Sequence, residues 1–123
     1  MDDSTSYKIY KLIEAEPDIS QRELARRLGV SLGKANYCIQ GLIGKGMVKA
    51  GRFYNTTNKQ AYMYLLTPRG IEDKAKVTLR YLKRRMKEYD EIREEIAQIK
   101  EEMANEKDKD MGAGETVSAP RVR

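Results

Sequence analysis

The stretch ISQRELARRLGVS, residues 19–31, decides the fold. Ser20 stands three residues before Glu23, the capping-box spacing in which the serine accepts from a backbone N–H and the glutamate reaches back. Gly29 can adopt the left-handed conformation that ends a helix, and Ser31 can cap the next one. The apolar face of the first helix would consist of Leu24, Ala25 and Leu28. Two helices joined by the tight Gly29-Val30 turn predict a helix-turn-helix.

The helix after Ser31 would end near residues 45–46 and would divide into an inner and an outer face. Its inner stripe would be Ala35, Ile39 and Leu42, at i, i+4 and i+7, with Cys38 beside it as a small packed hydrophobe rather than a redox sensor. Gly41 and Gly44 each cost a helix about 1 kcal/mol relative to alanine, and we expect the close approach of another backbone to account for them. The outer face would present Gly33, Lys34, Asn36, Tyr37 and Gln40.

Further elements flank this motif. Residues 4–16 show helical apolar spacing that stops before Pro17, and residues 47–53 and 61–66 are strand-like runs joined by a polar loop. Thr67 and Pro68 then supply a cap and a first helical residue for a long helix. We expect a mainly α fold with a small β-hairpin: a winged helix-turn-helix at residues 4–67, a coiled-coil dimerisation helix at residues 68–105 and a disordered tail at residues 106–123.

The charge points to nucleic acid. The formal net charge is +5 and the sequence pI is about 9.3. Residues 19–67 hold eight basic residues and one acid, a net +7 that coincides with the motif and the hairpin. We expect the outer face of the helix at residues 32–44 to read bases in double-stranded DNA, since asparagine can pair with adenine and lysine with guanine or phosphate. Predicted backbone contacts are Ser20, Gln21, Arg22, Ser31 and Lys45. Predicted wing contacts are Arg52, Asn55, Thr56, Asn58 and Lys59. Tyr62 and Tyr64 are predicted to pack within the strands.

The same residues carry a family resemblance. Residues 19–31 resemble the helix-turn-helix of MarR-type bacterial transcription regulators, and LLTPRG at residues 65–70 resembles their strand-to-helix junction. Residues 6–103, with GKANYC at residues 33–38, are similar to the EPS-associated MarR subfamily. The resemblance implies a link to exopolysaccharide genes. The wing lacks the Asp/Arg-rich tip usual in MarR proteins, and one C-terminal helix replaces the bundle that forms their effector pocket. A small-molecule effector is therefore not predicted.

The helix at residues 68–103 would be about 54 Å long and must pack on something. Its apolar residues follow a heptad pattern that rotates partway along: Ala75, Leu79, Leu82, Met86, Tyr89, Ile92, Ile96, Ile99 and Met103. This seam predicts a homodimer, with a helix folded back on its own domain as the alternative. An antiparallel pair would set basic residues 80–87 against acidic residues 91–95, whereas a parallel pair would let Arg85 meet Asp90 of its mate, so the orientation stays open. The basic stretch could instead touch flanking DNA phosphates.

Composition excludes much else. With no histidine the chain lacks the commonest general base and metal ligand, so we expect no enzyme, metal or cofactor. No apolar run is long enough for a membrane span, and the single cysteine and acidic N-terminus predict a cytoplasmic location. The expected function is a homodimeric regulator that binds a two-fold operator, more readily a repressor because occlusion needs no polymerase contact. The alternative is a protein-interaction adaptor with only generic nucleic-acid affinity.

Overall fold

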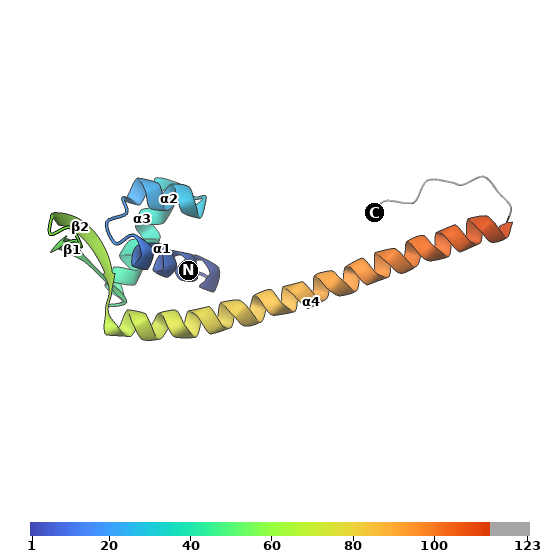
Figure 1. The fold of residues 1–123 in the computed structure, drawn as a ribbon. Coiled ribbons are helices and arrows are strands. Elements are labelled where there is room, and N and C mark those ends of the chain that lie inside the picture. The colour runs from blue at the N-terminus through green and yellow to red at the C-terminus, as the bar shows by residue number, and fades with distance from the viewer. Residues whose placement is uncertain (114–123) are drawn as a thin grey trace. The chain divides into compact units, whose positions relative to one another are not determined.

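The computed structural model describes residues 1–113 and has the predicted winged helix order (Figure 1). The elements in chain order are α1 (Asp3–Ala15), α2 (Gln21–Leu28), α3 (Leu32–Gly44), β1 (Val48–Tyr54), β2 (Gln60–Leu66) and α4 (Pro68–Ala113). The chain divides into two compact units, residues 1–83 and the part that begins at Arg84. The boundary between the two units falls within α4.

Side-chain caps set the helix starts, as the sequence predicts for α2 and α3. Ser20 Oγ accepts from the Glu23 N–H at 3.1 Å, and Ser31 Oγ accepts from the Lys34 N–H at 3.1 Å. Gly29 has a φ of 70° and ends α2, with its own N–H donating to the Arg26 carbonyl. The capping-box spacing also predicts that the Glu23 carboxylate bonds back to the start of α2, and this part of the prediction is wrong. The Glu23 carboxylate accepts from two guanidinium groups of its own helix, because charge-assisted bonds are stronger than one to a backbone N–H.

The core of the first unit lies between the three short helices, the hairpin and the start of α4. Ala35, Cys38, Ile39 and Leu42 are all buried, which confirms the predicted inner stripe of α3. The other large contributors are Ile9, Tyr10, Ile13, Leu24, Val48, Tyr64 and Val77. One continuous cluster therefore fixes α3 against the rest of the domain and leaves its other face outside.

The hairpin is antiparallel, and its register runs from Val48 opposite Leu66 to Tyr54 opposite Gln60. Each strand extends one residue further into the loop than predicted. The Tyr64 N–H donates to the Pro17 carbonyl at 2.8 Å, which ties β2 to the connection between α1 and α2. The wing is thus held at its base by a backbone bond as well as by core packing.

The start of α4 is locked against the turn after α3. Thr67 caps the helix, with its Oγ accepting from the Gly70 N–H at 3.1 Å, and the same hydroxyl donates to the Gly46 carbonyl at 2.5 Å. Gly70 lies so close to this turn that an added Cβ would sit 1.9 Å from the Met47 carbonyl oxygen. The predicted Thr67-Pro68 helix start is confirmed, and Gly70 is the residue that permits the contact.

Within the first unit, α4 packs on α1 through one face. Val77 is 2% exposed there, and the rings of Tyr7 and Tyr81 stack with centroids 4.8 Å apart. The Tyr10 hydroxyl donates to Asp73 at 2.6 Å, and burial together with this carboxylate raises the pKa of Tyr10. Ion pairs from Lys74 to Glu14 and from Arg80 to Asp3 border this face.

Helix α4 ends at Ala113 rather than at residue 105. The prediction of a tail from residue 106 is therefore wrong for residues 106–113, and residues 114–123 lie outside the described part of the chain. Residues 106–110, EKDKD, contain strong helix formers and no proline or glycine. Extending an existing helix needs no new nucleus, so a solvated segment can continue it without burying apolar surface.

Candidate nucleic-acid interface

The predicted base-reading residues share one exposed surface on α3. Gly33, Lys34, Asn36, Tyr37 and Gln40 are all exposed, because the residues between them hold the opposite face of α3 in the core. Tyr37 is the most prominent at 72% exposed, and the Lys34 ammonium lies 5.8 Å from its ring centroid. This contact holds a cation and a phenol together on the first turns of the helix, the part that reads base edges in helix-turn-helix complexes.

Three glycines leave this helix surface without side-chain cover. An added Cβ on Gly33, Gly41 or Gly44 would meet nothing within 4 Å. The close backbone approach expected at Gly41 and Gly44 is therefore not made by the described residues of this chain. Their cost in helix propensity is not repaid by internal packing. A surface that is open in this way lets another molecule come close to the α3 backbone.

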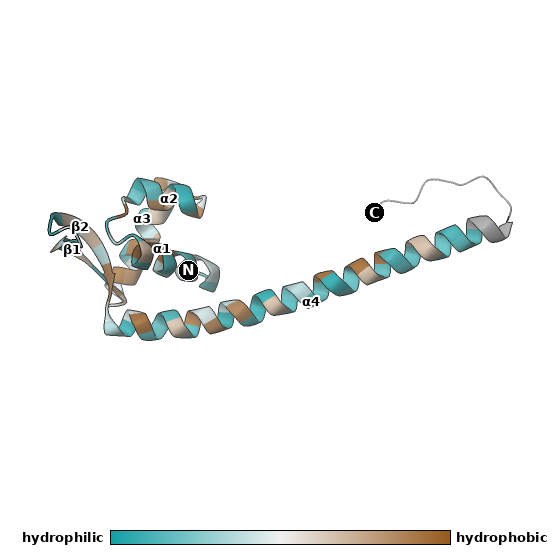
Figure 2. Cartoon of the chain, in the orientation of Figure 1, coloured by the Kyte–Doolittle hydropathy of each residue, from teal (hydrophilic) through white to brown (hydrophobic). Residues whose placement is uncertain are grey.

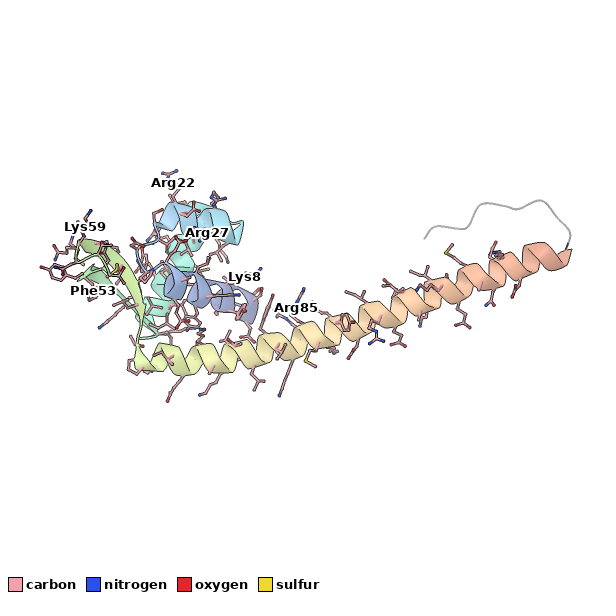
Figure 3. All side chains as sticks on the ribbon, viewed as in Figure 1. Lys8, Arg22, Arg27, Phe53, Lys59 and Arg85 are labelled. Atoms are coloured by element: carbon pink, nitrogen blue, oxygen red, sulfur yellow. The ribbon has the colours of Figure 1, made fainter. Side chains whose placement is uncertain are left out.

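The residues predicted to contact the DNA backbone all lie at helix ends, and all of them except Gln21 are exposed. Ser20 and Ser31 use their oxygens as cap acceptors, so each hydroxyl proton stays available to donate. Arg22 is exposed and points away from α2 (Figure 3), and Lys45 is exposed as the C-terminal cap of α3. Gln21 is different: it is half-buried, and its amide donates to the Tyr64 hydroxyl at 3.2 Å. Its side chain serves the attachment of α2 to the hairpin.

The one acid within residues 19–67 is neutralised locally. Glu23 forms ion pairs with Arg26 and with Arg27, and Arg27 also pairs with Glu16 at 2.8 Å. Hydrogen bonds from the two guanidinium groups hold the pKa of Glu23 at about 2, below its usual 4.5. Among the described residues, Arg22, Lys34, Arg52 and Lys59 form no ion pair. These cations remain free to meet a polyanion.

The wing tip is organised by Asn55. Its side-chain oxygen accepts from the backbone N–H groups of Thr57 at 3.1 Å and of Lys59 at 2.9 Å, and also from the Thr57 hydroxyl. Asn58 adopts a φ of 61°, a left-handed conformation that asparagine tolerates. The turn therefore holds the exposed side chains of Thr56, Asn58 and Lys59 outward, and Lys59 projects from the end of the hairpin in Figure 3. Asn55 itself acts as the scaffold of the turn.

Two exposed tyrosines of the hairpin were missed by the sequence reasoning. Tyr62 was predicted to pack within the strand, but it is 53% exposed, and Tyr54 is 70% exposed. Tyr62 lies opposite Arg52 in the register and makes an edge contact with the buried Tyr64 at 5.6 Å between centroids. Strand β2 extends past the edge of the core. One face of the sheet is therefore buried at Tyr64 and exposed at Tyr62. The signal in the sequence that could have indicated this exposure is the basic Arg52, which lies opposite Tyr62 in the hairpin.

Residues 2–49 match the family described as winged helix-turn-helix DNA-binding. The match covers α1, α2 and α3, including the whole of the exposed α3 surface, and ends at the start of β1. No curated protein matches the chain. The N-terminal unit therefore carries a winged helix-turn-helix DNA-binding domain, as the sequence predicts, and this domain suggests a DNA-binding regulator.

The predicted dimer seam lies on the exposed surface of α4. In the first unit Leu79 and Leu82 are 52% and 53% exposed, on the side of α4 away from Val77 and α1. In the second unit the exposed apolar residues are Met86, Tyr89, Ile92, Ile96, Ile99 and Met103. Apolar and polar bands alternate along α4 in Figure 2. Packing on α1 therefore leaves Leu79 and Leu82 exposed in the first unit, and the seam residues of the second unit are exposed as well. No helix within residues 1–113 has the length and apolarity to cross a membrane.

Proposed function

We propose that this protein is a sequence-specific transcription regulator that binds a two-fold DNA operator as a homodimer. The observation that carries the proposal is the outer face of α3, where Lys34, Asn36 and Tyr37 are exposed together on a helix whose other face is fixed in the core. From residue 24 to residue 71 the chain contains no acidic residue, so nothing on α3 or the hairpin repels phosphate.

The mechanism follows from the docking geometry of helix-turn-helix proteins. The N-terminal turns of α3 enter the major groove, where Asn36 can pair with adenine and Lys34 with guanine or a nearby phosphate. The open glycine surface allows the α3 backbone to come close to the base edges. Arg22 and the capping serines contact DNA phosphates at the helix ends, and Lys59 and Arg52 contact the DNA backbone beside the wing.

Dimerisation through the α4 seam supplies the second half-site. Two copies of α3 about 34 Å apart would meet the major groove on successive turns, which requires an operator with two-fold symmetry. An occupied operator that overlaps a promoter blocks polymerase, so repression is the proposed direction of control. Membership of the EPS-associated MarR group and control of exopolysaccharide genes are proposals that rest on resemblance. The proposal includes no catalytic activity.

Selection of binding sites from a library of random duplexes tests the proposal without knowledge of the target gene. The full chain should enrich a two-fold symmetric motif whose half-sites are one helical turn apart. The Asn36→Ala variant, run in parallel, should enrich a motif with relaxed preference at one position in each half-site. If no motif is enriched while the protein still retards DNA of any sequence, the interface is generic. The alternative, an adaptor that recruits other proteins through α4, would then be favoured.

A further inference from the structure

The charges that border the α4 seam differ between its two edges. The apolar stripe rotates partway along α4, so the heptad positions are assigned separately before and after Tyr89. Position a is held by Leu79 and Met86 before Tyr89 and by Ile96 and Met103 after it. Position e, on one edge, carries Lys76, Lys83, Asp90, Arg93, Lys100 and Lys107. Position g, on the other edge, carries Thr78, Arg85, Glu95 and Glu102. The e edge is thus basic except at Asp90, and in the second unit the g edge is acidic except at Arg85.

A parallel pair of helices sets each g residue against the e residue five positions later in its partner. Arg85 then meets Asp90 of the partner subunit. Glu95 meets Lys100 of the partner subunit, and Glu102 meets Lys107 of the partner subunit. Every one of these pairings is attractive and each occurs twice. Asp90 is the exception on the basic e edge and Arg85 is the exception on the acidic g edge. In-register parallel pairing brings these two residues together.

An antiparallel pair sets e against e and g against g. The apolar residues from Ala75 to Met103 are spaced symmetrically about Tyr89, so an antiparallel pair that covers them all has its two-fold axis there. Lys83 then lies against Arg93 of the partner subunit, and Lys76 lies against Lys100 of the partner subunit. Only Arg85, against Glu95 of the partner subunit, gains an attractive contact. The borders of the seam therefore oppose this orientation.

The basic stretch at residues 80–87 does not outweigh these contacts. A parallel pair brings this stretch beside its own copy, but Arg80, Arg84 and Lys87 are at positions that point away from the seam. Arg80 is paired with Asp3, and Arg84 lies 3.8 Å from Glu88 in its own chain. Outward charges on opposite sides of a helix pair are separated by more than the Debye length of about 8 Å at physiological salt, whereas the e and g contacts are direct.

We propose that two copies of α4 pair in parallel and in register, bordered by Arg85–Asp90, Glu95–Lys100 and Glu102–Lys107 contacts between subunits. This inference rests on the proposed homodimer and specifies its geometry. Each winged domain immediately precedes α4 in the chain, so parallel pairing gathers both domains at the N-terminal end of the coiled coil. That arrangement places two copies of α3 within reach of one operator.

A distance between spin labels tests the orientation in the absence of DNA. For this experiment, the spin label is attached to the full chain at Asp108→Cys. The second substitution, Cys38→Ala, removes the buried native thiol. Parallel pairing predicts label separations of about 20–30 Å, because paired helix axes lie 8–10 Å apart. Antiparallel pairing about Tyr89 predicts about 57 Å at 1.5 Å per residue, and this result would overturn the proposal. An absence of any coupling between labels would show a monomer and would also overturn it. Operator binding is measured separately on the unlabelled protein, so failure of the orientation leaves the DNA-binding proposal standing.

A charge reversal at Lys100 gives an independent test, because the two orientations predict opposite signs. Residues three and four positions away on either side are Ile96, Ala97, Met103 and Ala104, so the change alters no charge pair within the helix. In parallel pairing Lys100→Glu sets Glu against Glu95 of the partner subunit and weakens the dimer about tenfold, and adding Glu95→Lys restores it. Antiparallel pairing predicts a tighter dimer for Lys100→Glu alone. Glu101→Lys, on the outward face, is the matched control and should leave the dissociation constant within about twofold.

Discussion

The Cβ that Gly70 lacks would lie 1.9 Å from the carbonyl oxygen of Met47. This contact seats the first turn of α4 on the turn after α3, beside the Thr67 hydroxyl that bonds to the Gly46 carbonyl. We therefore expect Gly70→Ala to lower the free energy of unfolding by at least about 2 kcal/mol, because backbone on both sides must shift. Urea unfolding followed by circular dichroism measures it. Gly41→Ala, whose new methyl group meets open space, is the control and should stabilise the protein by up to about 1 kcal/mol. Equal stability of Gly70→Ala and the native protein would contradict the contact.

The ion pairs of Glu23 predict a pH-dependent contribution to stability. The folded-state pKa of about 2 is below the usual 4.5, so the contribution is present above pH 4.5 and is lost as the pH falls from there to about 2. Glu23→Gln should be less stable than the native protein at pH 7, and the two unfolding curves should converge as the pH approaches 2. Thermal melts across that range provide the comparison. A difference that is independent of pH would show that the carboxylate charge does not stabilise α2.

Asn36 and Lys59 should affect DNA binding in different ways. Asn36→Ala should lose discrimination between operator and random duplex, by about 1–3 kcal/mol, because a base contact is removed. Lys59→Ala should weaken binding to both duplexes alike and lower the salt slope by about 1, because a phosphate contact is removed. Fluorescence anisotropy on both duplexes at several salt concentrations separates the two effects. An equal loss on both duplexes for Asn36→Ala would remove its base-reading role.

Leu82 should be needed for the dimer but not for the fold. Its side chain is already half exposed in the single chain, so Leu82→Asp should leave the circular dichroism spectrum of the winged domain intact. A buried carboxylate in the seam would be costly, and the variant should therefore sediment as a monomer and bind DNA weakly. Lys87→Asp, on the outward face of α4, tests for a general effect of added negative charge. If Leu82→Asp still sediments as a dimer, the seam has been assigned incorrectly.

The sequence predicted those features that depend on local chemistry. The boundaries of α2 and α3 follow from Ser20, Gly29 and Ser31, because caps and left-handed glycines act within a few residues. The outer face of α3 followed from the spacing of its buried stripe. These local signals are enough to predict that Lys34, Asn36 and Tyr37 share one exposed surface of α3.

Features that depend on distant parts of the chain could not be predicted in the same way. Gln21 bonds to Tyr64, a contact between residues far apart in sequence that no local pattern indicates. The exposure of Tyr62 depends on where the hairpin extends past the core, whereas alternation along a strand shows only which residues share a face. The helix continues past residue 105 through helix propensity, so the loss of apolar residues there does not mark its end.

The most direct test of the account is the affinity of the full chain for an enriched duplex and for its scrambled counterpart, measured by fluorescence anisotropy across a salt series. The account predicts an affinity that falls steeply with salt and a gap of about a thousandfold or more between the two duplexes. Comparable weak binding to both duplexes would contradict it, since the exposed face of α3 would then carry charge without reading sequence.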